Sequence, residues 1–277
     1  MKLLVLDGNS IINRAFYGIK LLTTKDGRYT NAIYGFMNIF YKLCDELHPD
    51  SVAFAFDLKA PTFRHKMYDE YKAGRKPMPP ELAEQMPVLK DLLRALGYKI
   101  VTKEGYEADD ILGTLAFSCK DGDECYIATG DRDSLQLVGD NVKVLLASTK
   151  MGRPETNIYD VKRIKDDYGV TPHQLIDIKA LMGDSSDNIP GIPGVGEKTA
   201  TKMIVQFGSI ENAHEHLEEV KPNKAKESLR EHYDLAQLSK ELATINTDSP
   251  LEFSYEKAKV ENPYTPEAYE LCKRLEF

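Results

Sequence analysis

The feature that most constrains this chain is a set of nine carboxylates in five short groups, most of which end an apolar run or open a helix. The groups are Asp7; Asp57; Glu107, Asp109 and Asp110; Asp131 and Asp133; and Asp184 and Asp187. Acids gathered in one place cannot all ionise without compensating positive charge. Oxygen ligands without histidine suit Mg²⁺ or Mn²⁺ better than zinc. The acids therefore predict a site for two divalent cations, an arrangement suited to cutting phosphodiesters.

Short apolar runs alternate with helical patterns along the first half of the chain. The runs predict strands at residues 3–6, 52–56, 100–101, 125–128 and 142–146, and the stretches between them predict helices at 32–47, 80–96 and 107–119. This order is typical of an α/β fold with a mainly parallel central sheet flanked by helices. Ligands of such sheets bind outside the carboxyl ends of the strands. Asp7, Asp57 and Asp131 follow predicted strands, so we expect them at one edge of the sheet.

Each acid also has an ordinary structural explanation. A single aspartate after a strand is more often part of a turn than of a catalytic site. A carboxylate at the start of a helix is favoured by the helix dipole alone. Three acids within the four positions 107–110 exceed what that effect needs. The functional hypothesis therefore depends on convergence of the groups at one edge of the sheet.

Composition suits an ordinary globular protein of one large domain, or one domain with an appendage. Hydrophobic residues make up 42% and charged residues 29% of the 277 residues. The apolar start is cut short by Asp7, which argues against a signal peptide. The sequence has no apolar run of the roughly 18 residues that a membrane span needs. Its four cysteines form no metal-binding spacing. We therefore expect a monomeric cytoplasmic protein with no membrane association.

A basic segment lies between the second predicted strand and the helix at 80–96. Residues 59–76 hold six basic and two acidic residues within a chain of net charge −8. They could meet phosphates, although charge alone favours a solvated helix face. Tyr71 and Arg75 are four residues apart, with Lys72 beside them. On a helix they could stack a base and grip its phosphate, or Tyr71 could pack in the core.

Residues 171–207 predict two helices joined by a glycine- and proline-rich hairpin. The first helix runs from Thr171 to about Met182, and the second covers residues 197–207. Glycines let a backbone approach a phosphate closely, and free N–H groups at a helix start can bind it. An ordinary hairpin between two helices is the alternative. The stretch 192–200 is more specific, because it resembles the helix–hairpin–helix that binds DNA without sequence preference. The candidate DNA contacts in it are Gly191, Gly194, Gly196, Lys198, Thr199 and Lys202.

Taken together, these motifs resemble the 5′ nuclease domain of bacterial DNA polymerase I, in the flap endonuclease family. The resemblance is carried by residues 6–9, 54–57, 71–79, 105–110, 129–133 and 181–190, in the order of the family and over nearly the whole chain. It implies a PIN-like nuclease core at 1–170 with a helical arch at about 60–80. A helical region at 171–277 would follow, with the helix–hairpin–helix at about 173–207.

The resemblance also implies roles for individual residues. Asp7, Asp57, Glu107 and Asp109 would serve one metal, and Asp131, Asp133, Asp184 and Asp187 the other, with Asp109 near both and Asp110 in support. Tyr71, Lys72 and Arg75 would belong to the arch, with Lys72 and Arg75 facing the scissile phosphate. Arg14 would contact the substrate strand. In the family motif, hairpin carbonyls can also hold K⁺.

We therefore hypothesise a metal-dependent 5′–3′ exonuclease and flap endonuclease. Its substrate would be DNA with a 5′ flap, a 5′ end or a nick. The resemblance implies a role in primer removal and repair, and it allows a fusion to a DNA polymerase domain in the full protein. Two alternatives stay open. A catalytically silent DNA-junction binder would not need the intact acids, and an RNA-directed nuclease would not need the hairpin.

Overall fold

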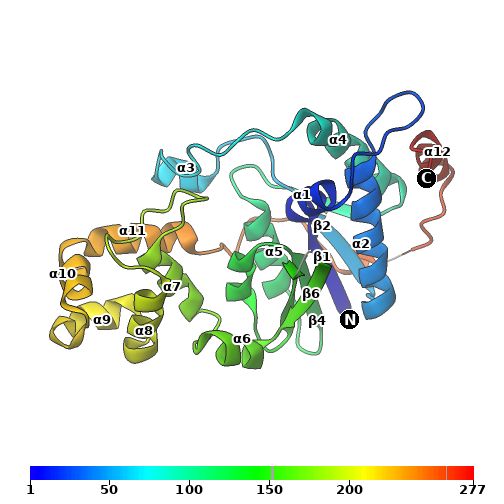
Figure 1. The fold of residues 1–277 in the computed structure, drawn as a ribbon. Coiled ribbons are helices and arrows are strands. Elements are labelled where there is room, and N and C mark those ends of the chain that lie inside the picture. The colour runs from blue at the N-terminus through cyan, green and yellow to red at the C-terminus, as the bar shows by residue number, and fades with distance from the viewer. Residues whose placement is uncertain (151–152, 260) are drawn as a thin grey trace.

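The structure, a computed structural model, describes residues 1–150, 153–259 and 261–277. These residues form one six-stranded sheet in the order β3-β2-β1-β4-β5-β6 (Figure 1). The strands are β1 Lys2–Asp7, β2 Ser51–Ala55, β3 Lys99–Val101, β4 Glu124–Thr129, β5 Val142–Lys150 and β6 Arg153–Tyr159. The first five run parallel, and β6 is antiparallel to β5. The prediction of a mainly parallel sheet is confirmed.

Helices cover both faces of this sheet, which explains the unbroken apolar runs of its strands. One face carries α1 Gly8–Gly18, α2 Asn31–Leu47, α4 Pro80–Ala95 and α12 Pro266–Arg274, and the other carries α5 Ala108–Phe117 and α6 Val161–Tyr168. Strand β1 shows the division: Leu4 and Leu6 belong to the first core, whereas Leu3 and Val5 belong to the second. Its carboxyl end is thereby held rigidly at the centre of the sheet.

Strand β6 is not among the strands that the sequence predicted. Its residues 155–157, Glu-Thr-Asn, are polar and give no apolar periodicity. The strand forms because its backbone pairs with β5, in a register that includes Leu146 with Asn157. An edge strand needs little apolar surface, so hydrophobic patterning could not reveal it.

A second group of helices follows the sheet and has its own core (Figure 1). It contains α7 Gln174–Met182, α8 Glu197–Phe207, α9 Ile210–Glu215, α10 Asn223–Glu231 and α11 Tyr233–Ala243. The predicted helix, hairpin and helix are present as α7, a turn-rich connection and α8. Among the described residues, no helix combines the length and apolar character that a bilayer crossing requires.

The segment expected to form a helical arch is mostly not helical. A short helix, α3 Phe63–Met67, is followed by turns at residues 69–74. Lys72 and Gly74 have positive φ values of 57° and 84°, which no α-helix tolerates. The segment also folds against the turn after α7, where the Lys72 N–H donates to the Asp187 carbonyl at 2.8 Å. The prediction of a helix through Tyr71 and Arg75 is therefore wrong.

Gly191 should be among the least replaceable residues of the hairpin. Its φ is 63°, and a Cβ there would lie 2.5 Å from the backbone nitrogen of Gly183. We expect Gly191→Ala to lower the free energy of unfolding by about 1–3 kcal/mol or more, because strain and overlap add. Gly196→Ala is the control, since its φ is −97° and a Cβ there meets nothing within 4 Å. Equal losses in urea unfolding would contradict this account.

Candidate active site

A recess of about 700 Å³ opens at the carboxyl ends of the central strands, and the helical region closes its other side. Eight of the nine predicted acids line it: Asp7, Asp57, Glu107, Asp109, Asp131, Asp133, Asp184 and Asp187. Strand β1 lies between β2 and β4, and the chain crosses from one side of it to the other. The recess thus lies where the strand order reverses, which is the usual ligand position in such sheets.

Local backbone structure fixes the two acids that follow β1 and β2. Asp7 caps α1, accepting a hydrogen bond from the Ser10 N–H at 3.0 Å and another from the Thr129 hydroxyl at 2.8 Å. Asp57 accepts from the Ala108 N–H at 2.7 Å. Burial, together with nearby Asp57 and Asp131, raises the pKa of Asp7 to about 6. Asp57 is exposed to the recess, and desolvation by its surroundings still raises its pKa.

Asp109 is the residue whose surroundings most favour a cation in the recess. Its Oδ1 atom is buried and has no hydrogen-bond partner among the described residues. Burial raises the pKa of Asp109 well above its ordinary value, and the carboxylates of Asp131 and Asp7 raise it further. An unpartnered buried carboxylate oxygen is costly unless something supplies positive charge. A divalent cation fits this donor set, which contains oxygen ligands and no histidine.

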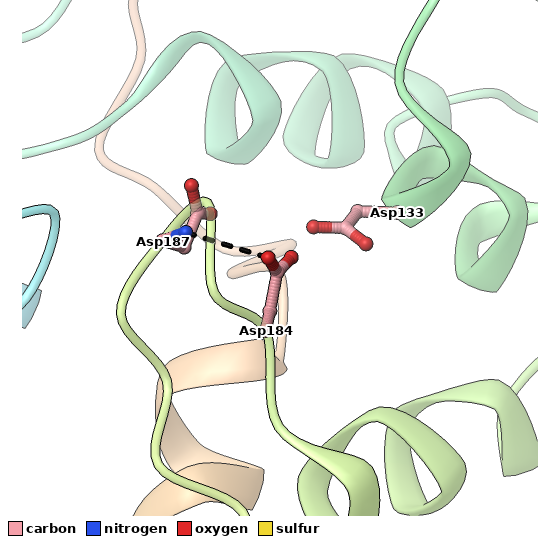
Figure 2. A group of neighbouring side chains, drawn as sticks. All are labelled: Asp133, Asp184 and Asp187. Atoms are coloured by element: carbon pink, nitrogen blue, oxygen red, sulfur yellow. Dashed lines mark hydrogen bonds between the residues drawn. The ribbon is translucent and has the colours of Figure 1, made fainter. Parts of the chain in front are cut away.

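A second acidic group lies across the recess. Oxygen atoms of Asp133, Asp184 and Asp187 all lie within 4.8 Å of one another (Figure 2). Asp133 comes from the 3₁₀ helix η1, Arg132–Leu137, whereas Asp184 and Asp187 belong to the turn after α7. That turn is closed by two backbone hydrogen bonds between Asp184 and Ile189, at 2.9 and 2.8 Å. Burial and Asp131 raise the pKa of Asp133 to about 6.

Asp110 does not line the recess. Its oxygens accept two hydrogen bonds from Arg64 at 2.8 Å, one from the Glu107 N–H at 3.0 Å and one from the Asn246 N–H at 2.9 Å. With both oxygens satisfied and the side chain fully buried, Asp110 cannot act as a direct ligand in this arrangement. Its place among the predicted metal ligands is therefore corrected: Asp110 holds the start of α5 from behind.

Basic side chains already pair with several of these acids. Lys72 pairs with Glu107, Arg75 with Asp187, and Lys179 with both Asp133 and Asp184. Burial opposes the charge of Glu107, yet Lys72 and Arg64 hold its pKa below the ordinary value. Burial likewise opposes ionisation of Asp184, but hydrogen bonds from Lys179 and Ser186 lower its pKa to about 2.

Lys179 and Arg64 were missed by the sequence analysis. Lys179 lies on α7, five residues before Asp184, and its ammonium is 2.8 Å from an oxygen of that residue. The sequence signal was a lysine within a mostly apolar helical stretch. Arg64 lies in the basic segment and is 2% exposed. Overall positive charge drew attention to that segment without distinguishing its one buried arginine.

Tyr71 and Arg14 lie differently from their predicted roles. Tyr71 is 4% exposed, packs with Ile176 and Ile189, and donates to Glu107 Oε2 at 3.0 Å. It cannot stack a base in this arrangement, so core packing, the alternative interpretation, describes it. Arg14 does not line the recess. It lines a neighbouring groove and donates a hydrogen bond to the Ser148 carbonyl.

The hairpin residues lie beside the recess rather than in it. Lys198 and Lys202 are exposed on α8, Gly194 and Gly196 are exposed, Thr199 is half-buried and Gly191 is buried. Glu197 and Thr201 of α8 do line the recess, so this helix contributes to its rim. The lysines are free to meet a ligand that extends beyond the acids.

This fold and this acid-lined recess define a class, the 5′ nucleases. Residues 2–169 match the family model of the 5′-3′ exonuclease, N-terminal resolvase-like domain. Residues 170–266 match that of the 5′-3′ exonuclease, C-terminal SAM fold. The chain belongs to the 5′–3′ exonuclease family and is by that membership a nuclease.

Curated relatives agree with this assignment, and solved structures share the fold. The DNA polymerase I of Bacillus subtilis (strain 168) is 50% identical over 254 residues, covering 91% of this chain and 29% of that protein. The chain spans about a third or less of the curated relatives that it matches. The T5 D15 protein crystallised with metal ions has a TM-score of 0.72 at 22% identity, with 89% of this chain and 90% of that one covered. A bacteriophage T5 flap endonuclease in a pseudo-enzyme–product complex with DNA and metal ions has a TM-score of 0.70 at 22% identity, with the same coverage.

Stability of the metal-free protein should fall as pH rises through the titration of Asp7. Its pKa is about 6 in the folded state against 3.8 ordinarily, so the folded state binds the proton more tightly. The stabilisation is complete below the lower value and is lost as pH rises past the higher one. In EDTA, we expect Asp7→Asn to raise the free energy of unfolding by roughly 1–3 kcal/mol at about pH 8, with the gain vanishing towards about pH 4.

Urea unfolding at several pH values measures this effect. Asp166→Asn is the matched control, because that carboxylate is exposed on α6 and pairs only with Lys162 among the described residues. A gain for Asp7→Asn that does not depend on pH would show that its burial and its neighbours do not control its ionisation.

Proposed function

We propose that this chain is a structure-specific nuclease that hydrolyses phosphodiesters at 5′ flaps and 5′ ends of DNA with two divalent cations. The observation that carries the proposal is the convergence of eight carboxylates in one recess, with the unpartnered Asp109 Oδ1 among them. The acids that influence Asp109 belong to both proposed metal groups, since they include Asp7 and Asp133. The family assignment supports the same reaction class.

The oxygen-only donor set favours Mg²⁺ or Mn²⁺. We assign Asp7, Asp57, Glu107 and Asp109 to one ion, and Asp131, Asp133, Asp184 and Asp187 to the other, with Asp109 near both. When bound, the two ions would supply an activated water and stabilise the leaving oxygen. The chain itself supplies the fixed geometry, because backbone hydrogen bonds orient Asp7 and Asp57.

Lys72 and Arg75 would act on the substrate phosphate. In the structure they pair with Glu107 and Asp187, at the edge of the recess. Once cations satisfy those acids, the two basic groups can turn their charge to the phosphate being cut, where negative charge accumulates. Lys179 would stay with Asp133 and Asp184 and keep them ionised.

We assign duplex binding to the exposed hairpin and the start of α8. The T5 flap endonuclease complex with DNA supports this kind of partner. Gly194 and Gly196 leave the backbone accessible, and Lys198 and Lys202 are exposed. Hairpin carbonyls would hold K⁺, and Arg14 would guide the substrate strand.

By analogy with the DNA polymerase I relatives, we propose a role in primer removal and repair in the cytoplasm. We also propose that the protein is a monomer and that a polymerase domain is present in the full protein. We also propose a domain division near residue 170.

Cleavage of a 5′-labelled double-flap DNA, with and without Mg²⁺, tests the proposal. We expect cleavage only with Mg²⁺, and we expect Asp109→Asn to reduce it severely, because a lost ligand removes several kcal/mol of charge stabilisation from the transition state. Asp166→Asn, an exposed acid on α6, is the control and should cleave normally.

The same assay separates the alternatives. Tight flap binding without cleavage in Mg²⁺ or Mn²⁺ would identify a silent junction binder. Faster cleavage of a matched RNA flap than of the DNA flap would identify an RNA-directed nuclease. Near-normal cleavage by Asp109→Asn in saturating Mg²⁺ would refute the assignment of the metal site.

Lys198 should control duplex affinity without sequence preference. We expect Lys198→Ala to weaken binding about equally for unrelated duplexes and to reduce the slope of log affinity against log salt by about one unit. Turnover at saturating DNA should change much less, because Lys198 does not line the recess. Fluorescence anisotropy at several salt concentrations measures the slope, with Lys273→Ala on α12 as the control. An unchanged slope would mean that the hairpin has only a structural role.

A further inference from the structure

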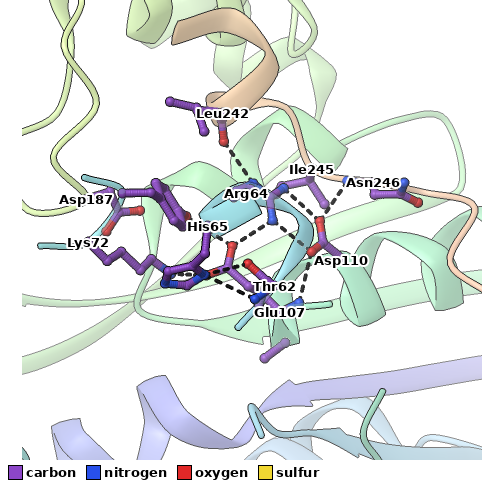
Figure 3. A network of polar contacts seen from close by, with 12 residues as sticks. Thr62, Arg64, His65, Lys72, Glu107, Asp110, Asp187, Leu242, Ile245 and Asn246 are labelled. Atoms are coloured by element: carbon purple, nitrogen blue, oxygen red, sulfur yellow. Dashed lines mark hydrogen bonds and ion pairs between the residues drawn. The ribbon is translucent and has the colours of Figure 1, made fainter. Parts of the chain in front are cut away.

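The guanidinium of Arg64 lies behind the recess, where hydrogen bonds hold it in place (Figure 3). It is 2% exposed, and a guanidinium has five N–H donors. Five hydrogen bonds use them: Nε to the Leu242 carbonyl at 2.9 Å, Nη1 to Glu107 Oε2 at 2.6 Å and Asp110 Oδ2 at 2.8 Å, and Nη2 to Asp110 Oδ1 at 2.8 Å and the Thr244 carbonyl at 2.7 Å.

These contacts join three parts of the chain that are distant in sequence. Arg64 belongs to α3, its two carboxylate partners belong to the start of α5, and the carbonyls lie at the end of α11 and just after it. The chain after α11 is also tied to α5 directly, because the Asn246 N–H donates to Asp110 at 2.9 Å. The start of α5 is therefore held from the basic segment and from the helical region at once.

The two carboxylate oxygens of Glu107 have different partners as a result. Oε2 accepts from Arg64 at 2.6 Å and from the Tyr71 hydroxyl at 3.0 Å. The other oxygen, Oε1, pairs with Lys72, and both Glu107 and Lys72 line the recess. A carboxylate with one oxygen fixed by two donors can rotate little, so it presents the other oxygen in one direction.

We propose that Arg64 is a positioning residue that, with Tyr71, fixes Glu107 so that Oε1 is presented to a metal ion. The inference rests on the proposed function, in which Glu107 is a ligand. Groups that hydrogen-bond to metal ligands orient them, and their loss typically lowers metal affinity or activity about 10–100-fold. The role needs the fork of an arginine, because a lysine has three donors on one atom and cannot span the same partners.

The competing explanation is that Arg64 only stabilises the fold by neutralising the buried Asp110. Breaking a buried ion pair from one side is strongly destabilising, whereas replacing both partners together is often close to neutral. Asp110 is fully buried and pairs with Arg64 through both oxygens, so the two roles can be separated by changing Asp110 as well.

The experiment compares Arg64→Met, Asp110→Asn, their double variant and Arg64→Lys in the full chain. Bound Mn²⁺ is counted by electron paramagnetic resonance, and thermal unfolding is followed in EDTA. Single-turnover flap cleavage is measured alongside the dissociation constant for flap DNA in EDTA. Arg94→Met is the control, since that arginine is exposed on α4 and pairs with Asp91.

We expect the double variant to unfold at a higher temperature than Arg64→Met, because the buried charge of Asp110 is removed with its partner, and yet to bind one of two Mn²⁺ ions about 10–100-fold more weakly than the wild type. Its single-turnover rate should fall by a similar factor while its DNA affinity holds. Asp110→Asn alone should keep Mn²⁺ affinity close to wild type, because Arg64 still holds Glu107. Arg64→Lys should fold and bind Mn²⁺ as weakly as the double variant.

Two results would overturn the proposal while leaving the proposed function intact. One is a double variant with wild-type Mn²⁺ affinity and rate. The other is a failure of the double variant and of Arg64→Lys to fold, which would make Arg64 structural. A wild-type protein that binds no Mn²⁺ would instead overturn the proposed function, and this inference with it.

Discussion

Repulsion among the carboxylates of the recess is the constraint on which the rest of the structure depends. Burial and neighbouring like charges together raise the pKa of Asp7 and of Asp133 to about 6, so the protein offsets only part of the cost of ionising these acids. The uncompensated part is concentrated at Asp109, which lacks any partner for Oδ1 among the described residues. The negative charge of the folded protein is therefore least compensated at Asp109, and a bound divalent cation would offset it.

The basic side chains that offset the charge of these acids form two layers, one behind the recess and one at its edge. The rear layer is buried: Arg64 and Asp110 are 2% and 0% exposed, and their geometry is fixed by hydrogen bonds on every side. The front layer is more accessible, since the side chain of Arg75 is 53% exposed where it pairs with Asp187. Ion pairs near solvent are weak and easily exchanged, whereas removing one partner of a buried pair is costly. The rear layer therefore suits permanent positioning, and the front layer suits exchange with a metal or a phosphate.

The sequence predicted the parts of this site that depend on local rules. Asp7, Asp57 and Asp131 were identified because a parallel sheet brings strand ends together, and that expectation needs only apolar runs and their order. Tyr71, Lys179 and Arg64 could not be placed in this way. Tyr71 and Arg64 each reach Glu107 across more than thirty residues of sequence, and no periodicity encodes such contacts. Strand β6 was missed for the same reason, since backbone pairing with β5 creates it.

The helical region is part of the candidate active site rather than a separate appendage. It supplies Asp184, Asp187 and Lys179 to the recess, and the carbonyls of Leu242 and Thr244 to Arg64. Asp184 also lies directly between α7 and the hairpin, and the Ile192 N–H donates to the Leu181 carbonyl at 2.9 Å, which joins the hairpin to the end of α7. The turn that carries two of the acids is therefore built into the same backbone as the hairpin. Because the same segment carries both, a duplex held by the hairpin, as we propose, would lie in a fixed position relative to the acids, and the backbone would then set the position of cleavage.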